Sequence, residues 1–282
     1  MEHLREKAVD FIYKVFAKDC LNNELSFNSD LYLKTIDGIY NEITKNVTPV
    51  NDPFMIRLGG QCGSGKTTQL VPAIKSTINC TNYIHLAVRL FAKCHPYYDE
   101  LINKYGIGLI REKTNGFALL CLFGVLEKLI KNKYNILFEV TILEPEFERY
   151  IINLAKNYNY SFSFHIMSVP FVISNNFANE RTNSNGNEKN RIMPKETLDY
   201  FYDVLSRGIN EIINNAKLFN ENDYVIIWNI TDSEPVLVTN KFDINVLNIF
   251  NKYRIFNDSI IIKDIETKLG EKINFYNKFF NN

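Results

Sequence analysis

The chain has 282 residues and a 46% hydrophobic content, and its 32 Lys and Arg balance 32 Asp and Glu exactly in number. A formal net charge of zero argues against a broad basic surface for nucleic acid. The N-terminus lacks the apolar stretch of a secretory signal, and no uninterrupted apolar run approaches the ~18 residues of a membrane span. Five cysteines without C-x-x-C spacing predict neither a disulfide framework nor a zinc site. We therefore expect a folded, soluble, cytoplasmic protein.

The first fifty residues predict helices. Apolar residues from Leu4 to Phe16 recur at helical spacing, which indicates an amphipathic helix over 2–18. A second helix is expected over 29–45, and the Asn- and Pro-containing turn at 48–53 ends this segment.

Beyond that turn, short apolar runs alternate with helical patterns. The alternation predicts an α/β fold, with a parallel sheet flanked by helices on both faces. The expected strands are 54–58, 83–87, 134–140, 162–169, 224–230 and 235–239, and the expected helices are 66–77, 117–132, 144–157 and 195–217.

The Asn-rich stretch 174–190 contains no apolar run. Two interpretations stay open, a surface loop or an active-site lid. Arg181 and Arg191 favour the lid, because arginines neutralise charge in phosphoryl transfer.

The most specific motif is a P-loop, G-x-x-x-x-G-K-[ST]. It follows an expected strand and opens an expected helix, which is the context the motif requires. Lys66 would reach the β- and γ-phosphates of a nucleotide, and the Thr67 hydroxyl would coordinate Mg²⁺. Pro72 predicts a kink or an early end in the helix that follows. The expected nucleotide-binding residues are Gly60, Gln61, Cys62, Gly63, Ser64, Gly65, Lys66, Thr67 and Thr68.

A P-loop predicts the nucleotide and leaves the reaction open among kinase, GTPase and mechanical ATPase. No N-K-x-D run is present for reading guanine, so ATP is favoured. The absence of repeats in 282 residues favours a small kinase over a mechanical ATPase.

Further motifs occur in a specific order around the P-loop. They are Leu58-Gly59-Gly60-Gln61, His95-Pro96, Glu139-x-Thr141 and Arg191-x-x-Pro194-Lys195-Glu196. This ordered set resembles the zeta toxin family, P-loop kinases of toxin–antitoxin systems, over roughly residues 55–235.

The resemblance implies a P-loop NTPase-type fold and phosphorylation of UDP-N-acetylglucosamine, or a related nucleotide sugar, by ATP and Mg²⁺. It also implies a small helical antitoxin as partner, with Lys66, Arg181 and Arg191 as catalytic residues. We expect an N-terminal helical segment at 1–50, a kinase domain at 51–240 and a C-terminal helical tail at 241–282 packed on it.

Three acceptor-side positions depart from the family pattern. Arg89 stands where the family has the acid that takes the hydroxyl proton, and Phe123 and Leu143 replace a glutamate and an arginine. Arg89, Glu139 and Thr141 are the expected acceptor-binding residues, with Glu139 or Asp99 as a substitute base. Three alternatives follow: a kinase with an altered acceptor, a UDP-amino-sugar kinase, or a catalytically impaired nucleotide-binding module.

Overall fold

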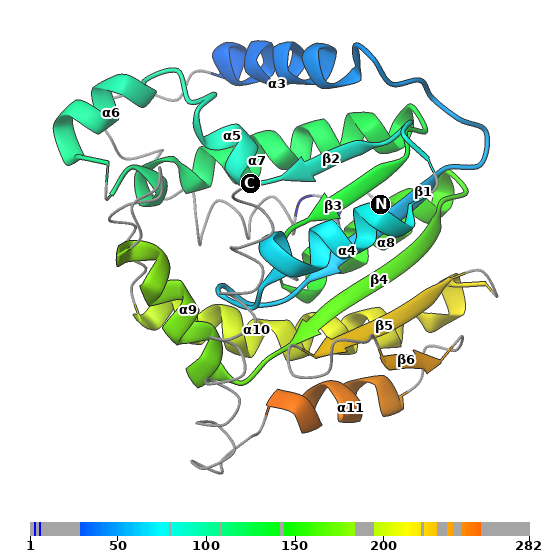
Figure 1. The fold of residues 1–282 in the computed structure, drawn as a ribbon. Helices are drawn as coiled ribbons and strands as arrows, with labels where there is room; N and C mark the ends of the chain where they lie inside the picture. The colour runs from blue at the N-terminus through cyan, green and yellow to red at the C-terminus, as the bar shows by residue number, and fades with distance from the viewer. Residues whose placement is uncertain are drawn as a thin grey trace.

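A six-stranded sheet in the order β2-β3-β1-β4-β5-β6 forms the centre of the computed structural model (Figure 1). The structure describes residues 3, 6, 29–78, 80–107, 109–141, 144–183, 195–220, 223–229, 236–239 and 244–254. Strands β1 to β5 pair in parallel, and β6 pairs antiparallel with β5 at one edge. The six strands are β1 (Phe54–Gly59), β2 (Ile84–Ala87), β3 (Ile136–Glu139), β4 (Ser161–Ser168), β5 (Tyr224–Asn229) and β6 (Val236–Thr239), which confirms every expected strand.

Helices cover both faces of this sheet, as the alternating pattern predicted. One face packs against α7 (Ile110–Lys131), α8 (Pro145–Asn157) and α10 (Lys195–Asn214) in a large apolar cluster. The other face packs against α4 (Val71–Thr77) in a smaller cluster that includes Leu58. Two clusters form because successive side chains of a strand point to opposite faces.

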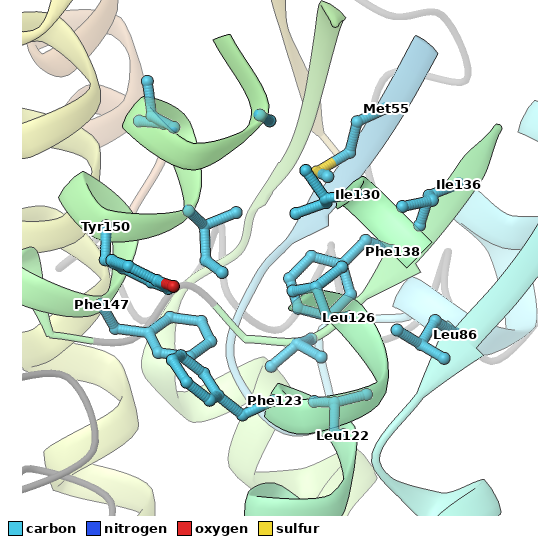
Figure 2. Packing of buried hydrophobic residues seen from close by; sticks show 14 of the residues in the cluster. Met55, Leu86, Leu122, Phe123, Leu126, Ile130, Ile136, Phe138, Phe147 and Tyr150 are labelled. Atoms are coloured by element: carbon cyan, nitrogen blue, oxygen red, sulfur yellow. The ribbon is translucent and has the colours of Figure 1, made fainter. Parts of the chain in front are cut away.

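The larger cluster is centred on α7, the longest described helix. Figure 2 shows Leu126 and Ile130 of α7 against Phe138 of β3. Phe123 stacks on Tyr150 of α8, with ring centroids 5.4 Å apart. Phe123 is therefore a core residue, only 2% exposed, and its position is closed to an acceptor.

Two further helices add buried apolar residues to the larger cluster. Helix α3 (Ser29–Thr44) confirms the helix expected over 29–45, and the Tyr32 hydroxyl joins it to α7 by donating to the Leu120 carbonyl at 2.8 Å. Helix α11 (Ile244–Arg254) packs near β5 and α10 (Figure 1). Apart from residues 3 and 6, the helix expected over 2–18 lies outside the described residues, as does the tail beyond 254.

Some helix boundaries differ from the sequence-based expectation. The segment expected as one helix over 66–77 is a π-helical turn, η2 (Lys66–Leu70), followed by α4. Pro72 lies in the first turn of α4, directly after the π-helical turn. Helix α7 begins at Ile110 rather than at 117. The prediction began too late because the polar first two turns of α7 carry no apolar stripe.

Three described helices were not expected at all. Two of them, α5 (Arg89–Ala92) and α6 (Tyr98–Tyr105), are short. The third, α9 (Phe171–Asn183), occupies the first part of the Asn-rich stretch, so the surface loop expected from 174 is wrong up to 183. The polar sequence of α9 has no helical period, and contacts of Ile173 and Ser174 with the rest of the fold hold it in place. None of the helices in the described ranges is long and apolar enough to cross a membrane.

Candidate nucleotide-binding and active site

The P-loop connects β1 to η2 at the carboxyl end of the parallel strands. Its backbone has positive φ at Gly60 (143°), Gly63 (77°) and Gly65 (83°), a region that side chains with a Cβ rarely adopt. The N–H groups of Gln69 and Leu70 both bond to the Gly65 carbonyl, which closes the π-turn. The loop therefore turns as the glycine spacing requires.

The polar groups of the loop fit a phosphate ligand. Lys66 Nζ folds over the loop and donates to the carbonyls of Gly60 and Gln61, the latter at 2.8 Å. The Ser64 hydroxyl is buried and has no hydrogen-bond partner within the part of the chain that the structure describes. A buried donor without a partner is costly, so an incoming phosphate oxygen would stabilise it. Cys62 and Thr68 complete the loop at the surface, half-buried and exposed respectively.

Helix α9 packs directly against the P-loop. Gln61 Nε2 donates to the Val169 carbonyl at 2.6 Å and to Ser174 Oγ at 3.1 Å. Gly63 lies so close to α9 that a Cβ added there would stand 1.8 Å from the Ser174 carbonyl oxygen. The first turn of α9 thus fixes the shape of the loop.

This close approach gives a first prediction. Gly63→Ala should abolish nucleotide binding, because the added methyl group meets backbone and the residue needs φ of 77°. Gly38→Ala is the matched control, since nothing lies within 4 Å of a Cβ at that helical position. Calorimetric titration with ATP should show lost binding for the first variant only. Equal binding by both variants would contradict the packing described.

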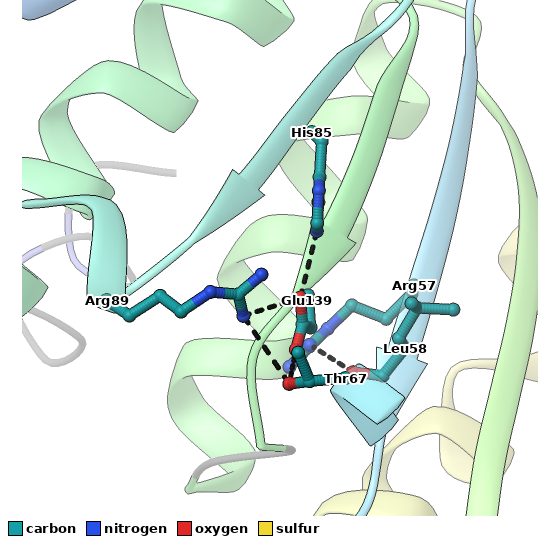
Figure 3. Close-up of polar contacts among 6 residues, drawn as sticks. All are labelled: Arg57, Leu58, Thr67, His85, Arg89 and Glu139. Atoms are coloured by element: carbon teal, nitrogen blue, oxygen red, sulfur yellow. Dashed lines mark hydrogen bonds and ion pairs between the residues drawn. The ribbon is translucent and has the colours of Figure 1, made fainter. Parts of the chain in front are cut away.

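Glu139, at the end of β3, collects the polar side chains beside the P-loop (Figure 3). Its carboxylate accepts a hydrogen bond from the Thr67 hydroxyl, and its Oε2 lies 2.9 Å from both His85 Nε2 and Arg89 Nη1. Arg89 Nη1 also lies 3.4 Å from Thr67 Oγ1. Sequence reasoning named Arg89, Glu139 and Thr67 separately, and the fold brings all three into contact.

The electrostatics of this cluster favour an ionised Glu139. Burial raises its pKa, but hydrogen bonds from His85 and Thr67 and the charge of Arg89 outweigh burial and lower the pKa to about 2. A carboxylate so placed is suited to orienting a hydroxyl or a cation. It is poorly suited to taking a proton, since a base works best with a pKa near the operating pH.

The lowered pKa also predicts how stability depends on pH. A carboxyl whose pKa falls on folding contributes stability above its ordinary value of 4.5, and this contribution is lost as the pH falls towards 2. Urea unfolding of Glu139→Gln should therefore lose stability less steeply than the parent chain over this range. Glu42→Gln, at an exposed position, is the control. Parallel pH profiles of Glu139→Gln and the parent chain would contradict the assignment.

Behind Glu139, a fully buried arginine holds the adjoining backbone. Arg57 of β1 pairs with Glu148 of α8 at 2.5 Å, and both side chains are 1% exposed. Its Nη1 donates to the carbonyl of Val140 at 2.5 Å, and its Nη2 lies 3.4 Å from that of Thr141. The guanidinium also lies over the Phe138 ring, 4.5 Å from its centre. Arg57 thus fixes the chain as it leaves β3.

Two other predicted site residues, Thr141 and Asp99, are described by the structure and are not brought to this cluster. Thr141 contributes the carbonyl contact with Arg57, and Asp99 lies exposed on α6. The backbone of Arg181 belongs to α9, and its side chain lies outside what the structure describes, as do Arg191 and Leu143.

Sequence reasoning missed three participants, namely His85, the Arg57–Glu148 pair and Ser174. The sequence contained a signal for Arg57 and for His85, because each is a charged or polar residue inside an apolar strand pattern, FMIRL and YIHLA respectively. Ser174 offered none, since its contact with the P-loop joins segments that are 113 residues apart.

Comparison with known proteins identifies relatives of both sequence and fold. Toxin PezT of Streptococcus pneumoniae is 26% identical over 182 residues, covering 64% of this chain and 68% of PezT. Toxin zeta of Streptococcus pyogenes is 23% identical over 152 residues, and the chain spans about half (52%) of its length.

Among solved structures, one from the PezAT chromosomal toxin–antitoxin system of S. pneumoniae superposes with a TM-score of 0.67 and 21% identity, covering 88% of this chain and 97% of that one. The AvrRxo1-ORF1:ORF2 complex follows at 0.53 and 14% identity, covering 88% and 82%. These likenesses show the fold. The zeta toxin family model matches residues 39–234, more than half of the sequence, and the chain belongs to that family of kinase-type toxins.

Proposed function

We propose that the chain is an ATP-dependent small-molecule kinase that transfers the γ-phosphate of ATP to a hydroxyl group. The observation that carries the proposal is the contact between Thr67 of the P-loop and Glu139 of the neighbouring strand. In P-loop enzymes, Mg²⁺ is held by the loop's Ser or Thr together with an acidic residue on a strand beside it. When bound, ATP and Mg²⁺ would supply the phosphoryl group and the charge that neutralises it.

The residues of the site divide this work between them. Lys66 would exchange its bonds to the loop carbonyls for the β- and γ-phosphate oxygens. Thr67 would keep donating its proton to Glu139 and offer its oxygen to Mg²⁺. Glu139 therefore serves the nucleotide side of the site in this proposal, which revises its expected role as an acceptor-binding residue.

Arg181 and Arg191 are proposed to neutralise charge on the transferring phosphoryl group. Arg191→Ala should then lower kcat by about a thousandfold and leave the affinity for ATP within about threefold, because arginines of this kind act on the transition state. Single-turnover kinetics together with calorimetric titration separate the two effects. An unchanged kcat would contradict the assignment.

The proposed acceptor is UDP-N-acetylglucosamine or a related nucleotide sugar. Arg89, which contacts Glu139, and Thr141, two residues after it, are the proposed acceptor-binding residues. The test is to incubate the chain with ATP, Mg²⁺ and UDP-N-acetylglucosamine and to follow the sugar nucleotide by mass spectrometry. A product carrying one added phosphate supports this acceptor, and ATP consumption without that product would rule it out.

A second candidate function, a catalytically impaired nucleotide-binding module, is favoured by the place of Arg89. Arg89 stands at the position where the family pattern has the acid that takes the hydroxyl proton, and its guanidinium contacts Glu139. Such a protein would bind ATP, form no phosphorylated product, and keep its cellular effect in the Lys66→Ala variant.

A small helical antitoxin is the proposed partner. Expression of the chain alone should arrest growth of a bacterial host, and co-expression of the antitoxin should relieve the arrest. We place the reaction in the cytoplasm, where ATP is available, and assign it to a domain spanning 51–240.

A further inference from the structure

A single nitrogen of the Arg89 guanidinium contacts two oxygen atoms beside the P-loop, one of Glu139 and one of Thr67. Its Nη1 lies 2.9 Å from Glu139 Oε2 and 3.4 Å from Thr67 Oγ1 (Figure 3). The Arg89 side chain is 37% exposed and that of Glu139 is 4% exposed. A positive charge held at the surface thus neutralises a carboxylate held inside the fold.

The same two oxygens are those that the proposed function gives to a divalent cation. Thr67 donates its only proton to Glu139, so the lone pairs of its oxygen are what it can offer to either Arg89 or a metal ion. Mg²⁺ binds oxygen at about 2.0–2.1 Å and demands near-octahedral geometry. A guanidinium nitrogen already in contact with both oxygens occupies that space, and its charge repels a second cation.

We propose that Arg89 and the divalent cation bind to Thr67 and Glu139 in mutually exclusive ways, so that Arg89 holds the place of the metal until the nucleotide brings it. This inference rests on the proposed ATP site. Arg89 is then a positioning residue with two states. In one it neutralises Glu139, and in the other its guanidinium is released from the two oxygens.

The geometry also explains why a positively charged side chain stands beside Glu139. Glu139 is buried, so without Arg89 its negative charge would be poorly compensated before the nucleotide binds, which would destabilise the fold. His85 contacts the same Oε2 from the strand side, and Arg89 approaches it from α5. Because the Arg89 side chain is 37% exposed, its guanidinium can leave without repacking the core.

The test measures metal affinity directly, with Mn²⁺ as the probe. Electron paramagnetic resonance gives the dissociation constant of Mn²⁺ for the full chain saturated with the ATP analogue AMP-PNP. Arg89→Ala and Arg89→Gln should each bind Mn²⁺ at least about fivefold more tightly than the parent chain, the lower end of usual coupling between sites. The matched control is Lys93→Ala, which removes an exposed positive charge four residues away and should change the affinity by less than about twofold.

Each outcome decides the matter. Tighter Mn²⁺ binding in both Arg89 variants, but not in Lys93→Ala, supports mutual exclusion. AMP-PNP binding with equal or weaker Mn²⁺ affinity in the Arg89 variants overturns it while leaving the proposed function intact. Failure of the parent chain to bind AMP-PNP at all overturns the proposed function and this inference with it.

Discussion

Replacing Lys66 by alanine should reduce phosphoryl transfer by at least about a thousandfold, because the lysine supplies the only P-loop side-chain charge for the β- and γ-phosphates. In the structure its ammonium group folds onto the loop carbonyls of Gly60 and Gln61, within reach of the space those phosphates would fill. The fold should be unaffected, since Lys66 is only half-buried.

The matched control is Lys75→Ala, an exposed lysine on α4 that is nine residues further along. It removes the same charge and should leave turnover within about twofold, as surface charges usually do. Transfer measured with both variants separates a local role from a general charge effect. Comparable loss in both, or full activity in Lys66→Ala, would contradict the proposed site.

Breaking the buried Arg57–Glu148 pair should have the largest effect on stability. Arg57→Met leaves the Glu148 carboxylate, 1% exposed, facing an apolar side chain. Removal of one partner of a buried pair costs about 3–5 kcal/mol. For a chain of this size that loss corresponds to a fall in Tm of about 10 °C. Differential scanning calorimetry measures it.

Two further variants distinguish the buried charge from lost contacts. Arg57→Met combined with Glu148→Leu should recover part of the stability, because no buried charge is then left facing an apolar side chain. Recovery stays incomplete, since the Val140 carbonyl loses its donor. Lys128→Met breaks an exposed pair with Asp37 and should cost at most about 1 kcal/mol. Equal losses for Lys128→Met and Arg57→Met would refute the role given to Arg57.

The parts of the fold that sequence predicted are those specified by local patterns. The apolar runs gave all six strands, and the glycine spacing with Lys66 and Thr67 gave the P-loop, because both signals lie within a few residues. The order of the further motifs then indicated the zeta toxin family, and the matched segment 39–234 contains these motifs.

The parts that sequence missed depend on distant contacts. Helix α9 lacks an apolar period and is held by Ser174 against Gln61, so its pattern resembled a loop. Phe123 was compared with an acceptor-binding residue of the family, yet the aromatic rings of α8 enclose it. Arg89 and Glu139 are 50 residues apart in the chain, and the adjacent strands β2 and β3 make them an ion pair. Such pairings follow from strand order, which no local pattern contains.

The most direct test of the kinase assignment is a search for phosphorylated products. The chain would be incubated with ATP and Mg²⁺ and a panel of UDP-amino sugars, other nucleotide sugars, NAD and nucleosides, with Lys66→Ala as the control and mass spectrometry as the readout. The account predicts one panel member carrying a single added phosphate, absent from the Lys66→Ala sample. Bound ATP with no phosphorylated product from any panel member would contradict the kinase and favour the nucleotide-binding module.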